Sequence, residues 1–189
     1  MKKIFVLAAL IMAFGISANA QGKITTTSLK LQGVEMVETL SEDGTSMIKR
    51  PYRWFAGIGK ADDMSTAVEM AQLEAYATVS RVIENVVSTQ AERGTAVVNG
   101  NVAKALKSYW EQMSMSIQNA TEPFGETQIS YNSETGMYEA IAKVGIRGDR
   151  YVKILDNALN AKPEGLSGSD LQQFIDTNNS IIDAAKSVN

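Results

Sequence analysis

The 189-residue sequence contains neither cysteine nor histidine. Without cysteine no disulfide can form, so a stable fold has to rely on packing alone. Without either residue, the chain lacks the usual zinc and copper ligands and the common pairs of a catalytic nucleophile with a histidine base. We therefore expect no metal, no cofactor and no catalytic residue, and we predict that the protein is not an enzyme.

An excess of basic charge is also missing. The chain has 18 lysines and arginines against 21 aspartates and glutamates, which gives a formal net charge of −3. Nucleic acids and anionic membranes attract proteins through clustered basic residues, so we expect no nucleic-acid partner. After residue 20 no apolar run is long enough to cross a bilayer, and we expect no transmembrane segment in the mature chain.

The start of the chain is typical of an export signal. Lys2 and Lys3 precede an apolar run over residues 4–14, which is too short to span a bilayer as a stable helix. Residues 17–20 then end in an A-x-A cleavage site. A short N-terminal membrane anchor is the alternative. We predict a signal peptide cleaved after Ala20 and a protein that is periplasmic or secreted.

The most regular part of the sequence is the stretch 54–87. A short apolar run over 54–59 predicts a buried strand, and residues 62 and 63 supply acidic side chains that can cap a following helix. A long Ala-rich helix is predicted next, because small and apolar residues recur there at spacings of three and four. This apolar side consists of Ala67, Met70, Ala71, Ala75, Val79, Val82, Ile83 and Val86. Its alanines keep the helix thin, so it can lie close on a sheet.

The pair Gly57 and Gly59 lies between a strand and a helix, where a dinucleotide-binding fingerprint would begin. The third glycine of that fingerprint would fall at Asp62, whose carboxylate would repel a pyrophosphate. We therefore expect no nucleotide here. Close packing of the strand against the helix explains the two glycines better.

The N-terminal part is expected to be β-rich. Residues 25–29 and 34–40 are β-like, and the turn signal at 42–45 predicts a hairpin into residues 47–49. A clearer hairpin is predicted further on, with strands over 128–132 and 137–146. On its return strand, alternate residues from Tyr138 to Ile146 share one face.

Three further helices are predicted. One lies between Gly100 and Pro123, one begins at Asp149, and one begins at a capping box at Ser169, after a linker over 162–165. In the first of these helices, aromatic and methionine residues form either a binding surface or a core with a few surface side chains. These residues are Tyr109, Trp110, Met113 and Met115.

The run from Trp54 to Ala61, the alanines of the central helix and the segment from Glu134 to Ala140 resemble the LPP20-like family. That family comprises small bacterial envelope domains, many of them lipoproteins, and includes the N-terminal domain of a flagellar basal-body ring protein. The resemblance covers about residues 50–160 and implies a small α+β domain without catalytic residues. Lipoprotein members carry a lipidated cysteine after the signal sequence, and this chain has none. It therefore cannot be anchored in that way.

We predict an α+β fold in which a small antiparallel sheet of about three strands is packed on one face by the Ala-rich helix and a second helix. The predicted strands cover 52–59, 126–132 and 137–146, and the helix after Asp149 is the second covering helix. The expected domains are a signal peptide (1–20), an N-terminal extension with a possible hairpin (21–49), an LPP20-like domain (50–162) and a C-terminal helix (163–189).

For the function we predict an exported, non-catalytic envelope protein that acts through protein–protein contacts. The partner would be another envelope protein or a second copy of the chain. One alternative is a secreted hydrolase that uses two carboxylates, which would need a pair about 5–10 Å apart in a pocket. The other is a self-associating structural subunit, suggested by the tail helix over 169–189.

Overall fold

The computed structural model describes the backbone of residues 30–93 and 100–187 and the side chains of residues 30–89 and 100–187. The predicted signal peptide (1–20) and the β-like piece at 25–29 lie outside these ranges. The elements are β1 (Gln32–Leu40), β2 (Met47–Ala61), α1 (Met64–Arg93), α2 (Gly100–Asn119), β3 (Glu122–Pro123), β4 (Gln128–Asn132), β5 (Met137–Arg147), α3 (Gly148–Asp156) and α4 (Gly168–Ser187). The predicted α+β class is confirmed.

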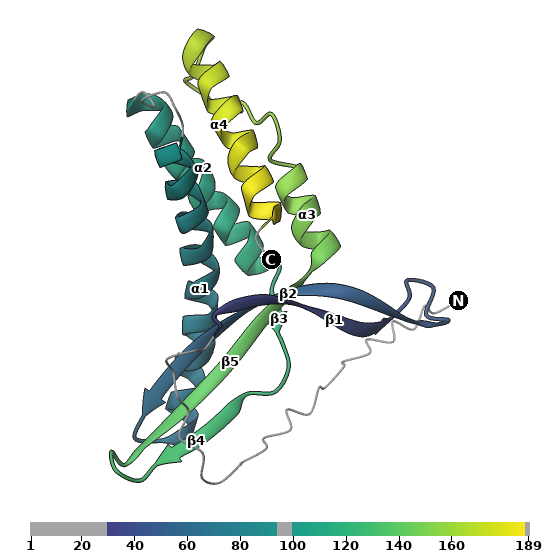
Figure 1. Cartoon of the computed structure of the whole chain (residues 1–189), viewed down its shortest axis with the longest axis vertical. Coiled ribbons are helices and arrows are strands. Elements are labelled where there is room, and N and C mark those ends of the chain that lie inside the picture. Colours follow the sequence, from purple (N-terminus) through teal and green to yellow (C-terminus); the bar gives the residue numbers. More distant parts are fainter. Residues whose placement is uncertain (1–29, 94–99, 188–189) are drawn as a thin grey trace, which may run out of the picture.

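One antiparallel sheet holds the five described strands (Figure 1). Its order is β1-β2-β5, and β3 and β4 both pair with the far side of β5. The hairpin of β4 and β5 is confirmed, as is the hairpin that joins β1 to the start of β2. The structure adds β3, and it joins the predicted strand over 34–40, as β1, to the sheet of the three predicted strands. It also joins the predicted segments 47–49 and 52–59 into a single strand of 15 residues.

The predicted strand begins at residue 52, yet β2 also includes Pro51. In an antiparallel strand, the backbone N–H and C=O groups of successive residues point to opposite neighbouring strands. The N–H of Ala56 donates to the carbonyl of Leu31, so the even-numbered residues of β2 point toward β1. Odd-numbered residues of β2, including Pro51, therefore point toward β5. The ladder with β5 begins only at Tyr52. The proline thus costs no hydrogen bond, because nothing in that ladder would accept from its nitrogen.

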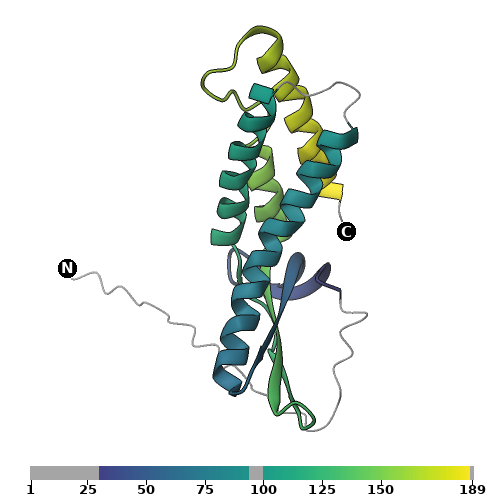
Figure 2. The same ribbon diagram turned by 90° about the vertical axis from the view of Figure 1, so that its left-hand side faces the viewer.

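The N-terminal half of α1 (residues 64–75), which we call its lower half, lies directly on the backbone of β2. Gly57 and Gly59 face the helix, and a Cβ atom on Gly59 would be 2.0 Å from the carbonyl oxygen of Ala67. The alanines at 67, 71 and 75 are fully buried, as the spacing predicted. The prediction for Met70 is wrong: its side chain is 46% exposed, because it lies on the flank of the helix beside Ala71. The described helices leave the opposite face of the sheet uncovered (Figure 2).

Asp63 caps the N-terminus of α1. Its Oδ1 accepts hydrogen bonds from the backbone N–H of Thr66 at 2.9 Å and from the hydroxyl of Ser65 at 2.7 Å. The bonds from Thr66, and then that from Ser65, lower the pKa of Asp63 from 3.8 to about 2. Of the two predicted caps, Asp63 is therefore the one that the chain uses.

The part of α1 that extends beyond the sheet (residues 76–89), which we call its upper half, packs with α2, α3 and α4 in a helical layer (Figure 2). The core of this layer contains large side chains from all four helices and continues to Phe55, Val144 and Ile146 of the sheet. α3 follows β5 without a loop, touches β2 and β5, and continues into this layer. Trp110 is only 3% exposed, so it belongs to the core and not to a surface.

The tail helix α4 docks on its own chain, against α1, α2 and α3. Phe174, Ile181 and Ile182 are fully buried in this contact. The helix begins at Gly168, where the carbonyl of Ser167 accepts from the N–H of Leu171. Ser169, the predicted start of the capping box, is thus the second residue of α4, one residue inside the observed start of the helix.

Candidate interaction surface

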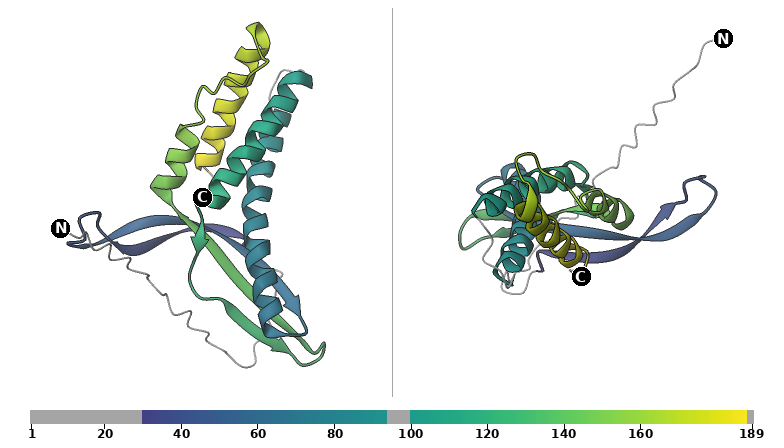
Figure 3. Two further views of the ribbon diagram at one scale, coloured as in Figure 1. Left: turned by 180° about the vertical axis from the view of Figure 1, so that it is seen from behind. Right: turned by 90° about the horizontal axis from the view of Figure 1, so that it is seen from above.

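Part of the first hairpin extends beyond the rest of the sheet. β5 pairs with β2 only as far as Tyr52, whereas β1 pairs with β2 up to Met47. Residues 36–51 therefore form a two-stranded ribbon, which we call the arm, and which projects from the side of the molecule (Figure 3). A two-stranded ribbon in water is marginally stable by itself, so the arm depends on what it contacts.

One face of the arm is apolar and exposed. The register places Leu40 opposite Met47 and Met36 opposite Pro51. The side chains of Met36, Leu40 and Met47 are 57%, 63% and 59% exposed. An ion pair of Glu38 and Lys49 lies between these apolar residues, with 3.9 Å from the Lys49 Nζ to the Glu38 Oε1. Both side chains are exposed, so the pair adds little stability. Clustered exposed apolar side chains of this kind mark interaction sites in many proteins.

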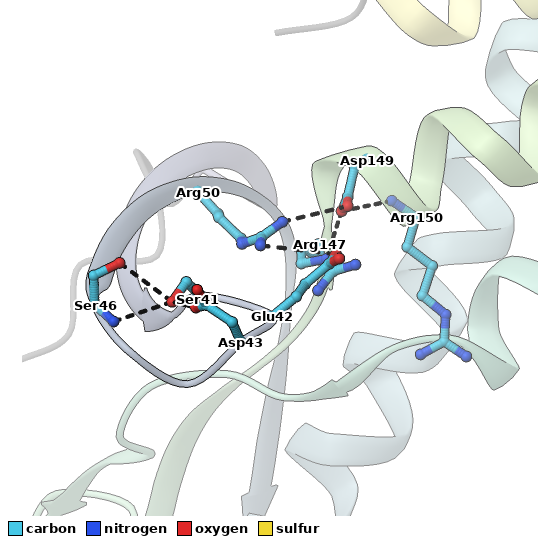
Figure 4. A network of polar contacts seen from close by, with 8 residues as sticks. All are labelled: Ser41, Glu42, Asp43, Ser46, Arg50, Arg147, Asp149 and Arg150. Atoms are coloured by element: carbon cyan, nitrogen blue, oxygen red, sulfur yellow. Dashed lines mark hydrogen bonds and ion pairs between the residues drawn. The ribbon is translucent and has the colours of Figure 1, made fainter.

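Polar contacts fix the arm to the body at its base and order its turn (Figure 4). In the turn, Ser41 donates to Asp43 at 2.5 Å and accepts from the N–H of Ser46 at 3.1 Å. At the base, Arg50 lies 3.6 Å from Asp149, the second residue of α3, and 3.9 Å from Glu42. The arm is thereby tied to the point where β5 passes into α3.

Asp149 is the centre of the contacts at the base. The Nε of Arg147 donates to its carboxylate at 2.5 Å, and the N–H of Arg150 donates at 2.8 Å. The hydrogen bond from the Arg147 side chain lowers the pKa of Asp149 most. The hydrogen bond from the backbone N–H of Arg150 and the positive charge of Arg50 lower it further. The ionised carboxylate of Asp149 faces the guanidinium of Arg50 at 3.6 Å, in an ion pair that is weak because Asp149 is half exposed.

A hollow of about 200 Å³ lies on the sheet face opposite α1. Its described lining residues are Lys30, Trp54, Ala56, Glu126, Gln128, Ile141 and Lys143. The Nζ of Lys143 lies 4.5 Å from the centre of a Trp54 ring, which is a cation–π contact. Glu126 is the one carboxylate among these residues, whereas the hydrolase alternative needs a pair.

The aromatic and methionine set of α2 is not a surface. Trp110 is buried, and burial raises the pKa of Tyr109. Met115, 60% exposed, is separated from both because it faces away from the helical core. The arm was not predicted as a site, although Val34, Met36 and Leu40 already show in the sequence the alternation that a one-sided strand requires.

Within residues 30–93 and 100–187, no group of three or more acidic side chains is placed to hold a metal ion. Over the same ranges, no helix is both long and apolar enough to cross a bilayer.

Comparisons with known proteins assign no family. No family model matches the chain, so the LPP20-like resemblance stays a prediction. No curated protein matches it either. Among solved structures, the chain is similar to a secreted protein of the human pathogen Helicobacter pylori, with 16% sequence identity and a TM-score of 0.29. The match covers 72% of this chain and 54% of that one, so the chain spans about half of its length. At this TM-score the likeness supports neither a fold nor a function.

Proposed function

We propose that this protein is exported to the bacterial envelope and acts without catalysis, by binding another protein through the arm. The exposed apolar face of Met36, Leu40 and Met47 is the observation that carries this proposal. Burying such a face against a partner would remove apolar surface from water, which is the main favourable term in protein association. The tail helix is already covered by its own chain, which takes away the feature that suggested self-association.

Export is the second part of the proposal, and the predicted signal peptide over residues 1–20 supports it. Cell fractionation followed by intact-mass measurement tests it directly. The expected mass is that of a 169-residue chain beginning at Gln21, recovered outside the cytoplasm. A full-length chain that stays in the cytoplasm would overturn the export and the envelope location together.

Site-specific photo-cross-linking in intact cells of the native host tests the binding. A photoreactive amino acid replaces Met47 in the arm, and in a matched control it replaces Met115 on α2. The two methionines have nearly equal exposure, 59% and 60%, so exposure alone cannot explain a difference. We expect a discrete cross-linked protein at Met47 and none at Met115. Equal cross-linking at both positions, or none at Met47, would contradict the proposal.

A further inference from the structure

The two edges of the sheet differ in how well they are protected from pairing with another strand. On one edge, β3 and β4 have two and five residues, and β3 contains Pro123. On the other edge, β1 has nine residues, with neither proline nor lysine. Natural proteins usually protect an edge strand by shortness, proline, bulges or charged side chains, lysine above all. Of these features β1 has only two glutamates, Glu35 and Glu38, and within the described part of the chain it pairs only with β2.

The backbone groups that β1 offers at its free edge can be assigned. The N–H of Ala56 donates to the carbonyl of Leu31 at 2.8 Å, so Leu31 points toward β2. Because the direction alternates along an antiparallel strand, the odd-numbered residues of β1 bond to β2 and the even-numbered residues point outward. The outward N–H and C=O groups belong to Gln32, Val34, Met36, Glu38 and Leu40. This is a row long enough to receive another strand.

Charge decides what kind of strand would fit. β1 carries Glu35 and Glu38 and no basic residue. If a second copy paired antiparallel along the full length of β1, Met36 would lie opposite Met36, each Glu35 opposite a Val37 and each Glu38 opposite a Val34. Neither carboxylate would then gain a basic partner, and the two Glu35 side chains would be diagonal neighbours on one face. A strand in which apolar and basic residues alternate would instead place its basic side chains on the face of Glu35 and its apolar side chains on the other face, beside Met36.

We propose that β1 adds a further strand to the sheet: an extended segment of another exported protein in which apolar and basic residues alternate. Main-chain hydrogen bonds to the outward groups of Val34, Met36 and Glu38 would hold it, and its apolar side chains would pack beside Val34, Met36 and Leu40. These three apolar side chains are 46%, 57% and 63% exposed. This inference rests on the proposed function, because it names the chemistry of the partner that the arm binds.

The test uses the mature chain and two capped nine-residue peptides, one of alternating valine and lysine and one of alternating valine and glutamate. Amide hydrogen exchange is followed by NMR. We expect the lysine peptide to slow exchange at Val34, Met36 and Glu38, and to leave Glu35 and Val37 unchanged because β2 already protects them. The glutamate peptide should have no effect, and added salt should weaken binding of the lysine peptide. Equal binding of both peptides, or protection that misses the outward amides, would overturn the proposal.

Two variants sharpen the test. Met36→Pro removes one outward donor and no bond to β2, so it should weaken binding of the lysine peptide at least about tenfold while the melting temperature stays close to that of the wild type. The double variant Glu35→Lys, Glu38→Lys keeps every backbone donor and should reverse the preference toward the glutamate peptide. Unchanged binding by Met36→Pro would overturn strand addition, and an unchanged preference in the double variant would overturn the charge argument.

The failure of this inference can be told apart from the failure of the proposed function. If cross-links at Met47 persist while the lysine peptide gives no protection at β1, the arm binds a partner but not by strand addition. If the molecular mass of the mature chain in solution instead rises with its concentration, and Met36→Pro abolishes that rise, a second copy of the chain occupies the edge. The proposed partner chemistry is then wrong.

Discussion

The two halves of α1 are packed in opposite ways. The lower half contacts the sheet through backbone and alanine, and its core consists of Ala61, Ala67, Ala71, Ala140 and Ala142. The upper half carries Val79 and Ile83 into a core with Trp110, Phe174 and Ile182. α1 is thus one continuous helix that packs through backbone atoms and alanine methyl groups in its lower half and through large side chains in its upper half.

The difference teaches which changes each half can tolerate. In the lower half the distance between helix and sheet is set by backbone atoms, so an added methyl group has no free space. In the upper half the distance is set by side-chain volume, so the removal of atoms leaves a cavity. We therefore expect additions to be most harmful below and deletions to be most harmful above.

The largest effect is expected from Phe174→Ala in the upper core. Phe174 is fully buried and packs edge-on against Tyr109, with ring centres 5.8 Å apart. Its truncation should lower the free energy of unfolding by about 4 kcal/mol, because a large apolar side chain is lost and a cavity remains. Urea unfolding followed by circular dichroism measures this. A loss below about 1 kcal/mol would show that the upper core repacks freely and would break the comparison.

The complementary change in the lower half is Gly59→Ala, which adds one methyl group. The new Cβ would lie 2.0 Å from the carbonyl oxygen of Ala67 and 2.5 Å from the nitrogen of Ala71, so helix and strand must separate. We expect a loss of about 3 kcal/mol in the free energy of unfolding, measured in the same way. Gly100→Ala is the control, since a Cβ there meets nothing within 4 Å. Equal stability of the two variants would refute close backbone packing.

A smaller effect is expected from Asp63→Ala, which removes the cap of the lower end of α1. The folded-state pKa of Asp63 is about 2, below its ordinary 3.8. Stability from the ionised carboxylate is therefore fully present above pH 3.8 and is lost as the pH falls through 2. The gap in urea midpoint between wild type and variant should be clear at pH 7 and should close on acidification. Asp62→Ala changes the net charge equally and should leave the midpoint nearly unchanged at both pH values.

The smallest effect on stability is expected from Met47→Ser in the arm, which belongs to neither half of the comparison. Its side chain is 59% exposed, so the free energy of unfolding should change by less than about 0.5 kcal/mol. Thermal melting checks this. A larger loss would mean that the apolar face of the arm stabilises the chain itself and is not held free for a partner.

Periodicity was a good guide to the elements and to most of their faces. The alanines at 67, 71 and 75 and the face of β5 from Ala140 to Ile146 are buried as predicted. Periodicity could not decide between neighbouring apolar residues: Tyr109 and Trp110 belong to one predicted set on α2, but Trp110 is buried and Tyr109 only partly so. Met70 failed for the same reason, because an apolar flank and an apolar core face look alike in one dimension.

The candidate surface could not be derived from the sequence. Alternation in β1 predicts a strand with one apolar side, but whether that side meets a core depends on where the neighbouring strands end. β5 stops pairing at Tyr52, so the same pattern that would fill a core in a longer sheet is left exposed in the arm. The surface on which α4 packs could not be predicted for a similar reason. An apolar stripe on a helix does not show whether its own chain or another molecule covers it.

The passage from Arg147 directly into Gly148 has a mechanical consequence. Two unbroken segments, α1 and the β5–α3 junction, connect the sheet to the helical layer at separate places. A single connection would let the two layers swivel about it, whereas two connections resist torque. Because β2 runs unbroken from the arm into the sheet, and Arg50 lies 3.6 Å from Asp149 beside that junction, a displacement of the arm would bear on the place where the sheet meets the helices.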